Sequence, residues 1–312
     1  MILPNNALKF IEKTLYKVFK EEIKSRIIFP LDTTGDPLAE TVGYNIYNVT
    51  GSAKIMAYPD AKDLPFVSDE MEEHTAKVYT IASGLKWTKT KLEKIAKAAS
   101  AGRIANVSVL TEQARGARRT CYKKENILVF AGDNRYKIKG IFDGSYYGAG
   151  KGTRETVAAT GTGSSTNWKD KTGKLIAEDI QKGITLTGGD GIFSDLTDKV
   201  TVVVPYAQYQ LLKKPFTDSV TETVYSWLKS VYPNLTVEYS SCVSQSFTGD
   251  SVDYMLVFRK DPEILSLHTP QDILLGKPTS PDVMGTVKQS VTLRTAGLVV
   301  RHPGALYVGR GI

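Results

Sequence analysis

The chain has 312 residues, 41% of them hydrophobic and 23% charged, a composition ordinary for a folded soluble protein with room for a buried core. Its formal net charge of +7 permits a polyanionic neighbour, but so mild an excess does not by itself indicate one. Two cysteines far apart exclude a disulfide framework and favour a reducing compartment, and the hydropathy pattern predicts neither a secretory leader nor a membrane span.

Residues 5–24 have the pattern of one amphipathic helix. Apolar side chains recur every three or four residues and form one stripe, made of Leu8, Ile11, Leu15 and Phe19. Lysines form an almost opposite stripe, made of Lys9, Lys13, Lys17, Lys20 and Lys24. Two interpretations stay open: the solvated face of a docked helix, and a basic arm that contacts an acidic partner.

A long antiparallel hairpin is expected next. Residues 44–49 alternate in the manner of a strand, a proline-containing tip AYPDAKDLPFVS follows, and EEHTAKVYTIASGL has strand character again. Polar and apolar residues are mixed on both predicted faces, and a hairpin of this length is marginal by itself. Its acidic residues predict a solvated or partner-facing edge made of Asp69, Glu70, Glu72 and Glu73.

Two helices are predicted after the hairpin. The first covers residues 89–101 and ends before Gly102, and a longer one covers residues 107–130. The apolar face of the longer helix is traced by Val107, Leu110, Ala114, Ala117, Cys121 and Leu128. Its other side is basic, with a solvated face as the simplest interpretation, and carries Arg115, Arg119 and Lys123.

The stretch GAGKGT, residues 148–153, invites comparison with a phosphate-binding loop. The motif G-x-x-x-x-G-K-[ST] needs a glycine where Ser145 stands and a hydroxyl where Gly152 stands. The following VAATGTGSSTN is too rich in glycine to form a sturdy helix whose N-terminus would hold the phosphates. A surface loop is therefore the expected structure.

From residue 199 the sequence alternates between strand and helix patterns. KVTVVVP predicts a buried strand, YAQYQLLKK a short helix, and SVTETVYSWLKSVYP a second helix with Ser219 and Glu222 at capping-box spacing. LTVEYSSCV and VDYMLVFRK predict two more strands. A helix is also expected over residues 168–183, and strands are expected in the tail after residue 283. Residues 199–283 thus indicate an α/β domain set within a discontinuous partner.

No catalytic, cofactor or metal site is predicted. The three histidines His74, His268 and His302 lack the spacing of metal ligands, and no GxSxG nucleophile motif occurs. Cys121 falls on the apolar face of a predicted helix, where a packed and inert thiol is expected. We therefore expect neither enzymatic activity nor a cofactor.

Four stretches and their order carry a family resemblance: ETVGYNIYNVTGSAKIMAYPDAKDLPFVSDE, ARRTCYKKENILVFAGD, VVVPYAQYQLL and SVTLRTAGLVVRHPGALYV. In these the chain resembles the major capsid proteins of tailed bacteriophages with the Hong Kong phage type of capsid fold, in a branch long catalogued as a domain of unknown function. The resemblance covers most of the chain. It rests on the order and the residue patterns of these stretches, since none of them is a catalytic signature.

The resemblance implies an α+β fold and a role for each part of the chain. The parts are an N-terminal arm (residues 1–43), an extended hairpin loop that lies across a neighbouring subunit (44–85), a peripheral domain (86–198 and 284–312) with a spine helix (107–130), and an α/β axial domain (199–283). The chain shows no long charged N-terminal segment of the kind that serves as a built-in scaffold. It also shows no pattern for a covalent lysine–asparagine cross-link.

The implied function is self-assembly into hexamers and pentamers that form an icosahedral head shell around double-stranded DNA. The implied partners are further copies of the chain, the packaged DNA through non-specific proximity, and portal and scaffolding proteins, with decoration proteins left open and no membrane. The implied location is the virion, after assembly in the host cytoplasm. Two alternatives stay open: an encapsulin-like cellular nanocompartment shell, and a nucleotide-binding enzyme that uses the GAGKGT loop.

The residues themselves also suggest contacts between subunits. A hairpin too long to be stable alone is sensible if a second copy covers it. The acidic hairpin edge and the basic side of the long helix are complementary in sign, and we expect them to meet between subunits. The candidate contact residues are Asp69, Glu70, Glu72, Glu73, Tyr47 and Phe66 of the hairpin, Arg115, Arg119 and Lys123 of the helix, and Lys13, Lys17, Lys20 and Lys24 on the arm.

Overall fold

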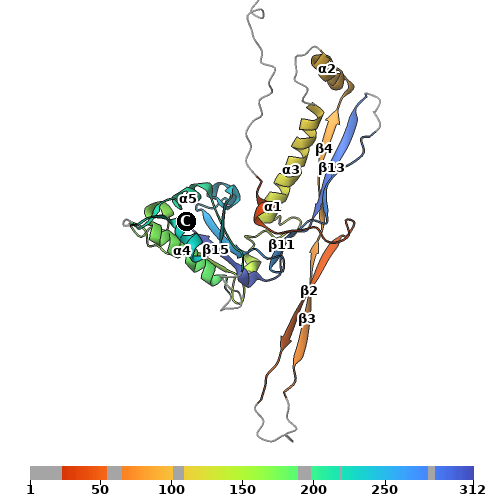
Figure 1. Cartoon of the computed structure of the whole chain (residues 1–312). Helices are drawn as coiled ribbons and strands as arrows, with labels where there is room; N and C mark the ends of the chain where they lie inside the picture. Colours follow the sequence, from red (N-terminus) through yellow and green to blue (C-terminus); the bar gives the residue numbers. More distant parts are fainter. Residues whose placement is uncertain (1–22, 55–64, 101–108, 189–197, 218–219, 280–284) are drawn as a thin grey trace, which may run out of the picture. The chain divides into compact units, whose positions relative to one another are not determined.

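The computed structural model describes residues 23–54, 65–100, 109–188, 198–217, 220–279 and 285–312. Their backbone divides into two compact units (Figure 1). The smaller unit contains Thr80–Asn126 and Gln271–Arg294, and the larger one contains Ser25–Tyr79, Ile127–Pro270 and Thr295–Ile312. The helix predicted over residues 5–24 lies almost wholly outside the described residues.

The smaller unit is built on a three-stranded sheet. The strand order is β12 (Gln271–Leu275), β13 (Val287–Thr295) and β4 (Tyr79–Trp87). β4 therefore lies at one edge of the sheet, and β13 lies in the middle. Two helices follow β4 along the chain, α2 (Lys89–Ser100) and α3 (Val109–Ala131), and they confirm the helices predicted over residues 89–101 and 107–130 as far as the chain is described.

α3 packs on this sheet through the face that the sequence marks as apolar. Ala117 and Cys121 are buried in one cluster with Leu85 and Trp87 of β4, and the cluster is completed by Val291 and Leu293 of β13. The indole N–H of Trp87 donates to Gln113 Oε1 at 2.6 Å, which satisfies a polar group inside an otherwise apolar contact.

The core of the larger unit is a mixed five-stranded sheet. Its strand order is β5 (Thr153–Thr156), β15 (Leu306–Arg310), β10 (Tyr254–Arg259), β6 (Val200–Val204) and β9 (Thr236–Tyr239). β10 is antiparallel to both of its neighbours, whereas the outer strands β5 and β9 are parallel to theirs. All residues of β6 and β10 are buried, as their apolar runs predict for strands covered on both faces.

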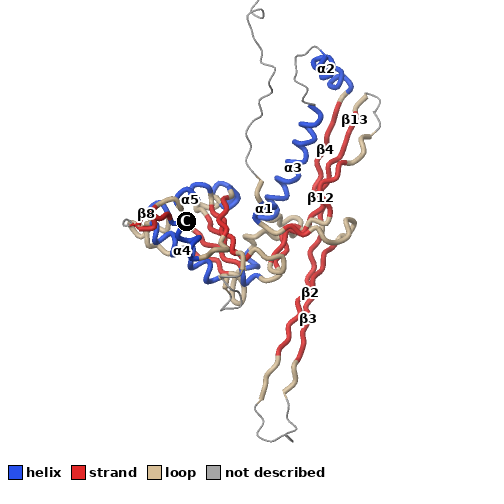
Figure 2. Tube along the Cα trace, in the orientation of Figure 1, coloured by secondary structure: helices blue, strands red, loops and turns tan. Residues whose placement is uncertain are grey.

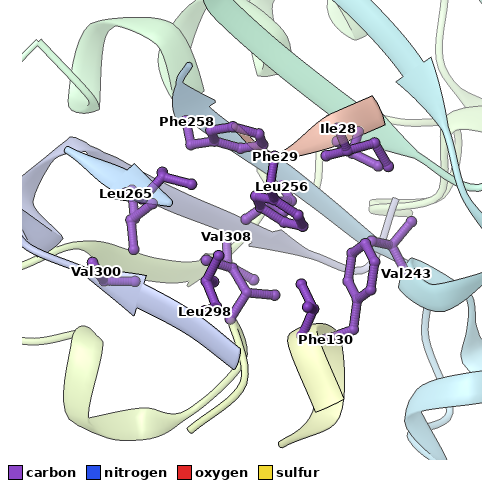
Figure 3. Packing of buried hydrophobic residues seen from close by; sticks show 14 of the residues in the cluster. Ile28, Phe29, Phe130, Val243, Leu256, Phe258, Leu265, Leu298, Val300 and Val308 are labelled. Atoms are coloured by element: carbon purple, nitrogen blue, oxygen red, sulfur yellow. The ribbon is translucent and has the colours of Figure 1, made fainter. Parts of the chain in front are cut away.

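Alternate residues of this sheet point into two different cores, because side chains in a strand alternate between its faces. Leu256 and Phe258 pack with Phe29 and Phe130 in the first core (Figure 3). Met255, Val257 and Tyr307 pack against α4 (Gly173–Leu186) in the second. α4 carries Gly183 at this contact, where a Cβ atom would lie 2.9 Å from both Tyr307 and Val257, so only glycine permits so close an approach.

The remaining elements of the larger unit are short. A second three-stranded sheet has the order β1 (Leu31–Asp32), β11 (Leu265–His268) and β14 (Gly297–Val300), with β1 parallel to β11. The other elements are α1 (Ser25–Ile28), α5 (Tyr206–Leu211), β7 (Pro215–Thr217), β8 (Val220–Thr223), α6 (Val224–Val231), α7 (Gln245–Thr248) and the 3-10 turns Gly144–Tyr146, Trp168–Asp170, Ser241–Val243 and Pro303–Ala305.

The helix predicted over residues 219–233 was wrong at its start. Val220–Thr223 form β8, which pairs with β7, since a run of β-branched residues favours a strand. α6 begins at Val224, and Thr223 Oγ1 accepts a hydrogen bond from the Ser226 N–H at 3.2 Å. Thr223 therefore caps the helix in place of the predicted capping pair. The helix predicted over residues 168–183 likewise divides into the 3-10 turn Trp168–Asp170 and α4.

Strand pairing brings together segments on either side of residues 199–283. β5, α4 and β15 lie outside this range and yet complete the five-stranded sheet and its cover, whereas β12 lies inside the range and belongs to the smaller unit. The division of the chain into arm, hairpin loop, peripheral and axial domains at the predicted boundaries stays a prediction.

β2 (Thr41–Thr50) and β3 (Ser68–Lys77) form the predicted hairpin as a two-stranded antiparallel ribbon (Figure 2). Its register runs from the pair Thr41–Lys77 to the pair Thr50–Ser68. Among the residues that the structure describes, neither strand pairs with a strand of another sheet. The second predicted strand of the hairpin divides at Val78 into β3 and β4, which belong to different sheets.

The first core should dominate the stability of the larger unit. Phe258→Ala removes a side chain that is 0% exposed, and the cavity left behind should cost about 3–5 kcal/mol of unfolding free energy in urea titrations of the unassembled subunit. Phe66→Ala is the matched control, since Phe66 is 88% exposed and its removal should change the unfolding free energy by less than about 0.5 kcal/mol. Equal losses in both variants would contradict this account of the core.

Candidate assembly surfaces

The register of the hairpin assigns each exposed side chain to one of its two faces. Directly opposed residues share a face, and the faces alternate along each strand. Tyr47 lies opposite Met71 and Val49 lies opposite Asp69 on the first face. The side chains of Tyr47, Val49 and Met71 are more than half exposed, and we call these three residues the apolar hairpin face.

The opposite face is mostly polar over the same length, with Ile46 as its apolar residue. Asn48 lies opposite Glu70, and Ile46 lies opposite Glu72. The acidic residues are thus divided, with Glu70 and Glu72 on this face and Asp69 and Glu73 beside the apolar hairpin face. The acidic residues therefore do not share one face of the ribbon, because side chains alternate along β3. Both faces mix polar and apolar residues, as expected, and the role of the acidic residues as a solvated or partner-facing edge stays a prediction.

At its root the hairpin is tied to the rest of the larger unit by polar contacts. The Tyr44 hydroxyl donates to the Val300 carbonyl at 3.1 Å, and the Tyr44 ring stacks on His74 with centroids 5.3 Å apart. Arg301 lies over the same ring, with Cζ 5.5 Å from its centroid, and its Nη2 is 3.6 Å from Asp32 Oδ2. A cationic group over an aromatic face adds an electrostatic attraction to this packing.

The Asp32 carboxylate contacts Arg301, His268 and Thr34. His268 Nδ1 lies 3.2 Å from Asp32 Oδ2, and the Thr34 hydroxyl and N–H both donate to Asp32 Oδ1. Burial raises the pKa of Asp32, but the hydrogen bonds from Thr34 and the contact with His268 lower it by more, so that the pKa lies below its usual value. The charged form of this carboxylate therefore contributes to holding the root together.

The basic side of α3 lies where it was predicted. Arg115, Arg119 and Lys123 follow one another at intervals of four residues, on the side of the helix opposite the buried Cys121. Arg115 pairs with Glu112 of the same helix at 3.0 Å, and both partners are partly exposed. An exposed pair of this kind contributes little free energy and can be exchanged for another partner.

The predicted basic face of the arm falls mainly outside the described residues. Lys13, Lys17 and Lys20 lie there, and Lys24 is buried with 7% of its surface exposed. Lys24 stands directly before α1, whose Ser25 and Ile28 are buried as well. Lys24 therefore does not belong to an exposed basic face. Phe66, by contrast, is strongly exposed close to the start of β3.

The GAGKGT loop does not have the geometry of a phosphate site. Lys151 Nζ donates to the Ser145 carbonyl of the same loop at 2.9 Å, and the loop leads into the strand β5. A phosphate loop needs a helix N-terminus at that point, with its N–H groups and dipole directed at the anion.

The described part of the chain contains no group of three histidine, cysteine, aspartate or glutamate side chains arranged to hold a metal ion. Cys121 and Cys242 are buried and are not joined in a disulfide, and burial raises the pKa of the Cys121 thiol, which makes it less reactive. Among the described helices, none combines the length and apolar character needed to cross a membrane.

Comparisons with known proteins agree with this picture. Residues 51–312 match the model of a family described as "Major capsid protein". The fold is similar to the capsid of Myoviridae phage XM1 (TM-score 0.79, 14% identity, 100% of this chain and 99% of that one) and to the capsid of a native GTA particle (0.67, 10%, 99% and 97%). It is also similar to a virus-like particle from Pyrococcus furiosus (0.56, 13%, 91% of each chain). Among curated proteins none matches. The predicted α+β capsid fold is thereby confirmed.

Nothing in the local sequence marks the cluster at the hairpin root. Asp32, His268 and Arg301 come from three distant segments, which meet because β1 pairs with β11 and places Asp32 opposite His268. The alternation of residues along each strand indicates which side chains of that strand share a face. Which residues of β2 and β3 lie opposite each other depends on the register, and the sequence alone does not determine the register of the two strands.

Loss of the Asp32 charge should make the unassembled subunit less sensitive to acid. A carboxylate with a lowered folded-state pKa stabilises above its unfolded pKa of about 3.9, and this contribution is lost as pH falls through the lower folded value. Asp32→Asn should therefore lower the unfolding free energy at pH 6 and lose less than the parent between pH 6 and pH 3. Asp170→Asn, at an exposed position, is the control. Identical pH profiles for Asp32→Asn and the parent would refute this role.

Proposed function

The chain belongs to the major capsid protein family, as a structural component of a virion rather than an enzyme, and we propose that its copies form the hexamers and pentamers of an icosahedral head shell around double-stranded DNA. This proposal rests on the hairpin. It is a long two-stranded ribbon whose side chains are largely exposed to solvent in the single subunit.

The hairpin is an unfinished structure in a single subunit. Two-stranded ribbons are marginal in water, and this one exposes the apolar hairpin face together with Phe66 and Val67. Scattered exposed apolar residues are common, but a contiguous group on one face of an unsupported ribbon marks a surface that associates. A neighbouring copy supplies the missing cover in an interface of obligate size.

A contact between the hairpin and a neighbouring copy also explains how copies close into rings. A hairpin on one copy that docks on a different surface of the next copy makes a head-to-tail contact. Repeated around an axis, head-to-tail contacts close into rings, and rings of two sizes can tile a shell. The proposal therefore requires the hairpin and its receiving surface to be different patches of the same chain.

Charge supports α3 as part of the receiving surface. Asp69, Glu70, Glu72 and Glu73 make β3 acidic, and Arg115, Arg119 and Lys123 make the outer side of α3 basic. Complementary charges steer association and fix register more than they add affinity. The candidate contact residues that the sequence indicates are also the contacts proposed here, with the exception of the buried Lys24.

The packaged DNA and the other proposed partners involve no dedicated site. A net charge of +7 suits non-specific proximity to DNA. Portal and scaffolding proteins, and decoration proteins where a shell has them, belong to the same proposal. The fold shared with a virus-like particle leaves an encapsulin-like shell as the alternative, and the contents of purified shells decide between them. Shells from infected or induced host cells should contain DNA and not a protein cargo.

The expressed protein should form closed shells by itself or with its scaffold. Negative-stain microscopy should show round or polyhedral particles whose surface resolves into rings of six and five subunits. A protein that remains monomeric at high concentration, with and without the other head proteins, would overturn the proposed function.

Reversal of the basic side of α3 should impair assembly more than folding. Arg115→Glu with Arg119→Glu places like charges opposite an acidic hairpin, so the yield of shells should fall roughly tenfold or more. The unfolding midpoint of the unassembled subunit should change little. Lys169→Glu with Lys229→Glu changes the net charge equally at exposed positions and serves as control. Normal shells from the α3 variant would refute the pairing.

A further inference from the structure

A cavity of about 350 Å3 lies in the larger unit, beside the root of the hairpin. Its floor is apolar and includes the buried side chains of Ile138, Leu298 and Val300. Its sides are formed by the end of β3 and by the loop that follows α3. Cavities of about 300–1,000 Å3 are the size at which proteins enclose small organic molecules. The space is therefore sufficient for a small ligand.

Three exposed lysines line the cavity. Lys77 is the last residue of β3, and Lys137 and Lys139 belong to the loop that follows α3. No acidic side chain is found among the described residues that line the cavity. Within the same part of the chain, Lys77 and Lys137 form no ion pair. Three ammonium groups around one cavity repel one another and attract an anion, and the low dielectric of the apolar floor strengthens that attraction.

The nearest carboxylates are engaged elsewhere. Glu72 Oε1 lies 3.4 Å from His74 Nε2, and Asp143 Oδ1 accepts a hydrogen bond from the Ser145 N–H at 2.8 Å. Neither carboxylate lines the cavity. The positive charge of the lysines is thus not balanced inside the cavity by the groups that form it.

The backbone of the loop holds two of these lysines in place. Asp133 and Ile138 exchange backbone hydrogen bonds of 2.8 and 3.0 Å. Gly140 packs so closely against Gly132 that it leaves no room for a Cβ atom. Lys137 has a φ of 56°, a left-handed conformation that is uncommon for residues other than glycine. A loop fixed in this way presents its charges in a preorganised arrangement, which lowers the entropic cost of binding a ligand.

Tyrosine rings complete the lining, at Tyr44, Tyr79 and Tyr146. The hydroxyls of Tyr44 and Tyr79 already donate to backbone carbonyls, so these two residues offer only their rings. The Tyr146 hydroxyl has no hydrogen-bond partner in the described part of the chain, and burial raises its pKa, so it stays protonated and able to donate. Lys139 Nζ lies 5.6 Å from the centroid of the Tyr146 ring, which places an ammonium group beside this donor.

These groups together define the chemistry of a ligand. Lysine binds phosphate as a point charge, and a phenol donates well to a phosphate oxygen. Aromatic rings and an apolar floor favour a flat apolar body, because both surfaces lose contact with water when it binds. A ligand that carries both features uses the whole cavity.

We propose that the cavity binds a small phosphorylated molecule with a flat apolar body. Its phosphate lies at Lys77, Lys137 and Lys139, and its body lies on the apolar floor beside the tyrosine rings. This site goes beyond the proposed function, because all of its groups belong to one subunit and binding requires no neighbour.

Equilibrium dialysis with adenosine 5′-monophosphate (AMP) tests the site, on the unassembled subunit and on closed shells. AMP carries both proposed features, whereas adenosine lacks the phosphate and inorganic phosphate lacks the flat body. One AMP should bind to each subunit, with half-saturation at about 0.1 mM in low salt. Adenosine and inorganic phosphate should each bind roughly tenfold more weakly or worse, because each uses one part of the cavity.

Two variants separate the parts of the site. Lys137→Gln with Lys139→Gln should weaken AMP binding roughly tenfold or more and leave adenosine binding unchanged, since only the phosphate contacts are lost. Tyr146→Phe keeps the ring and removes the hydroxyl, so AMP binding should weaken roughly threefold or more while adenosine binding stays the same. Lys169→Gln with Lys229→Gln changes the net charge equally at exposed positions and should bind AMP as the parent does.

Three results would overturn the site. They are a parent protein that binds no AMP at about 1 mM, equal AMP affinity in the parent and the Lys137/Lys139 variant, and a short DNA duplex that binds through these lysines where AMP does not. The last result would assign the lysines to packaged DNA. All three leave the proposed function standing, since shell formation tests that separately, and AMP binding by a protein that forms no shells would support the site alone.

Discussion

An unpaired β-ribbon is the constraint on which the rest of the structure depends. The strands β2 and β3 satisfy one edge of each other and leave two outer edges, together with the apolar hairpin face, for something else to cover. Water can solvate the edges, but an ordered ribbon in water gains little to offset the conformational entropy of ordering it. We propose that the ribbon is a component of an interface, in which a second copy covers it.

The five-stranded sheet of the larger unit, by contrast, has its apolar side chains buried within the subunit. Two cores fill both faces of the five-stranded sheet, and α4 approaches that sheet closely enough to require Gly183. The hairpin root is fastened to this body by Tyr44, Arg301 and Asp32. In the proposed function, assembly covers the hairpin and leaves the packing of these two cores unchanged.

Much of this fold could be predicted from the sequence, because helical periodicity marks α3, continuous apolar runs mark β6 and β10, and alternation marks the hairpin. The start of α6 was predicted wrongly, because the capping-box spacing of Ser219 and Glu222 indicated a helix where the β-branched run Val220–Thr223 pairs with β7 instead. The division of the acidic residues between two faces depends on the register of β2 and β3, which the sequence alone does not determine. The position of β4 at the edge of its sheet and the contact between Asp32 and His268 both follow from the order of strands in the sheets. Strand order depends on pairing between distant segments, so no local sequence pattern predicts it.

Hydrogen exchange of the backbone amides in β2 and β3 tests the central claim most directly. The same protein is measured as a dilute unassembled subunit and in closed shells, with the amides of β10 as the internal standard for a buried strand. The account predicts rapid exchange over residues 45–50 and 68–73 in the isolated subunit, slow exchange there in shells, and slow exchange of β10 in both. Slow exchange of the hairpin in the isolated subunit would show that the ribbon is complete without a neighbour and would contradict the account.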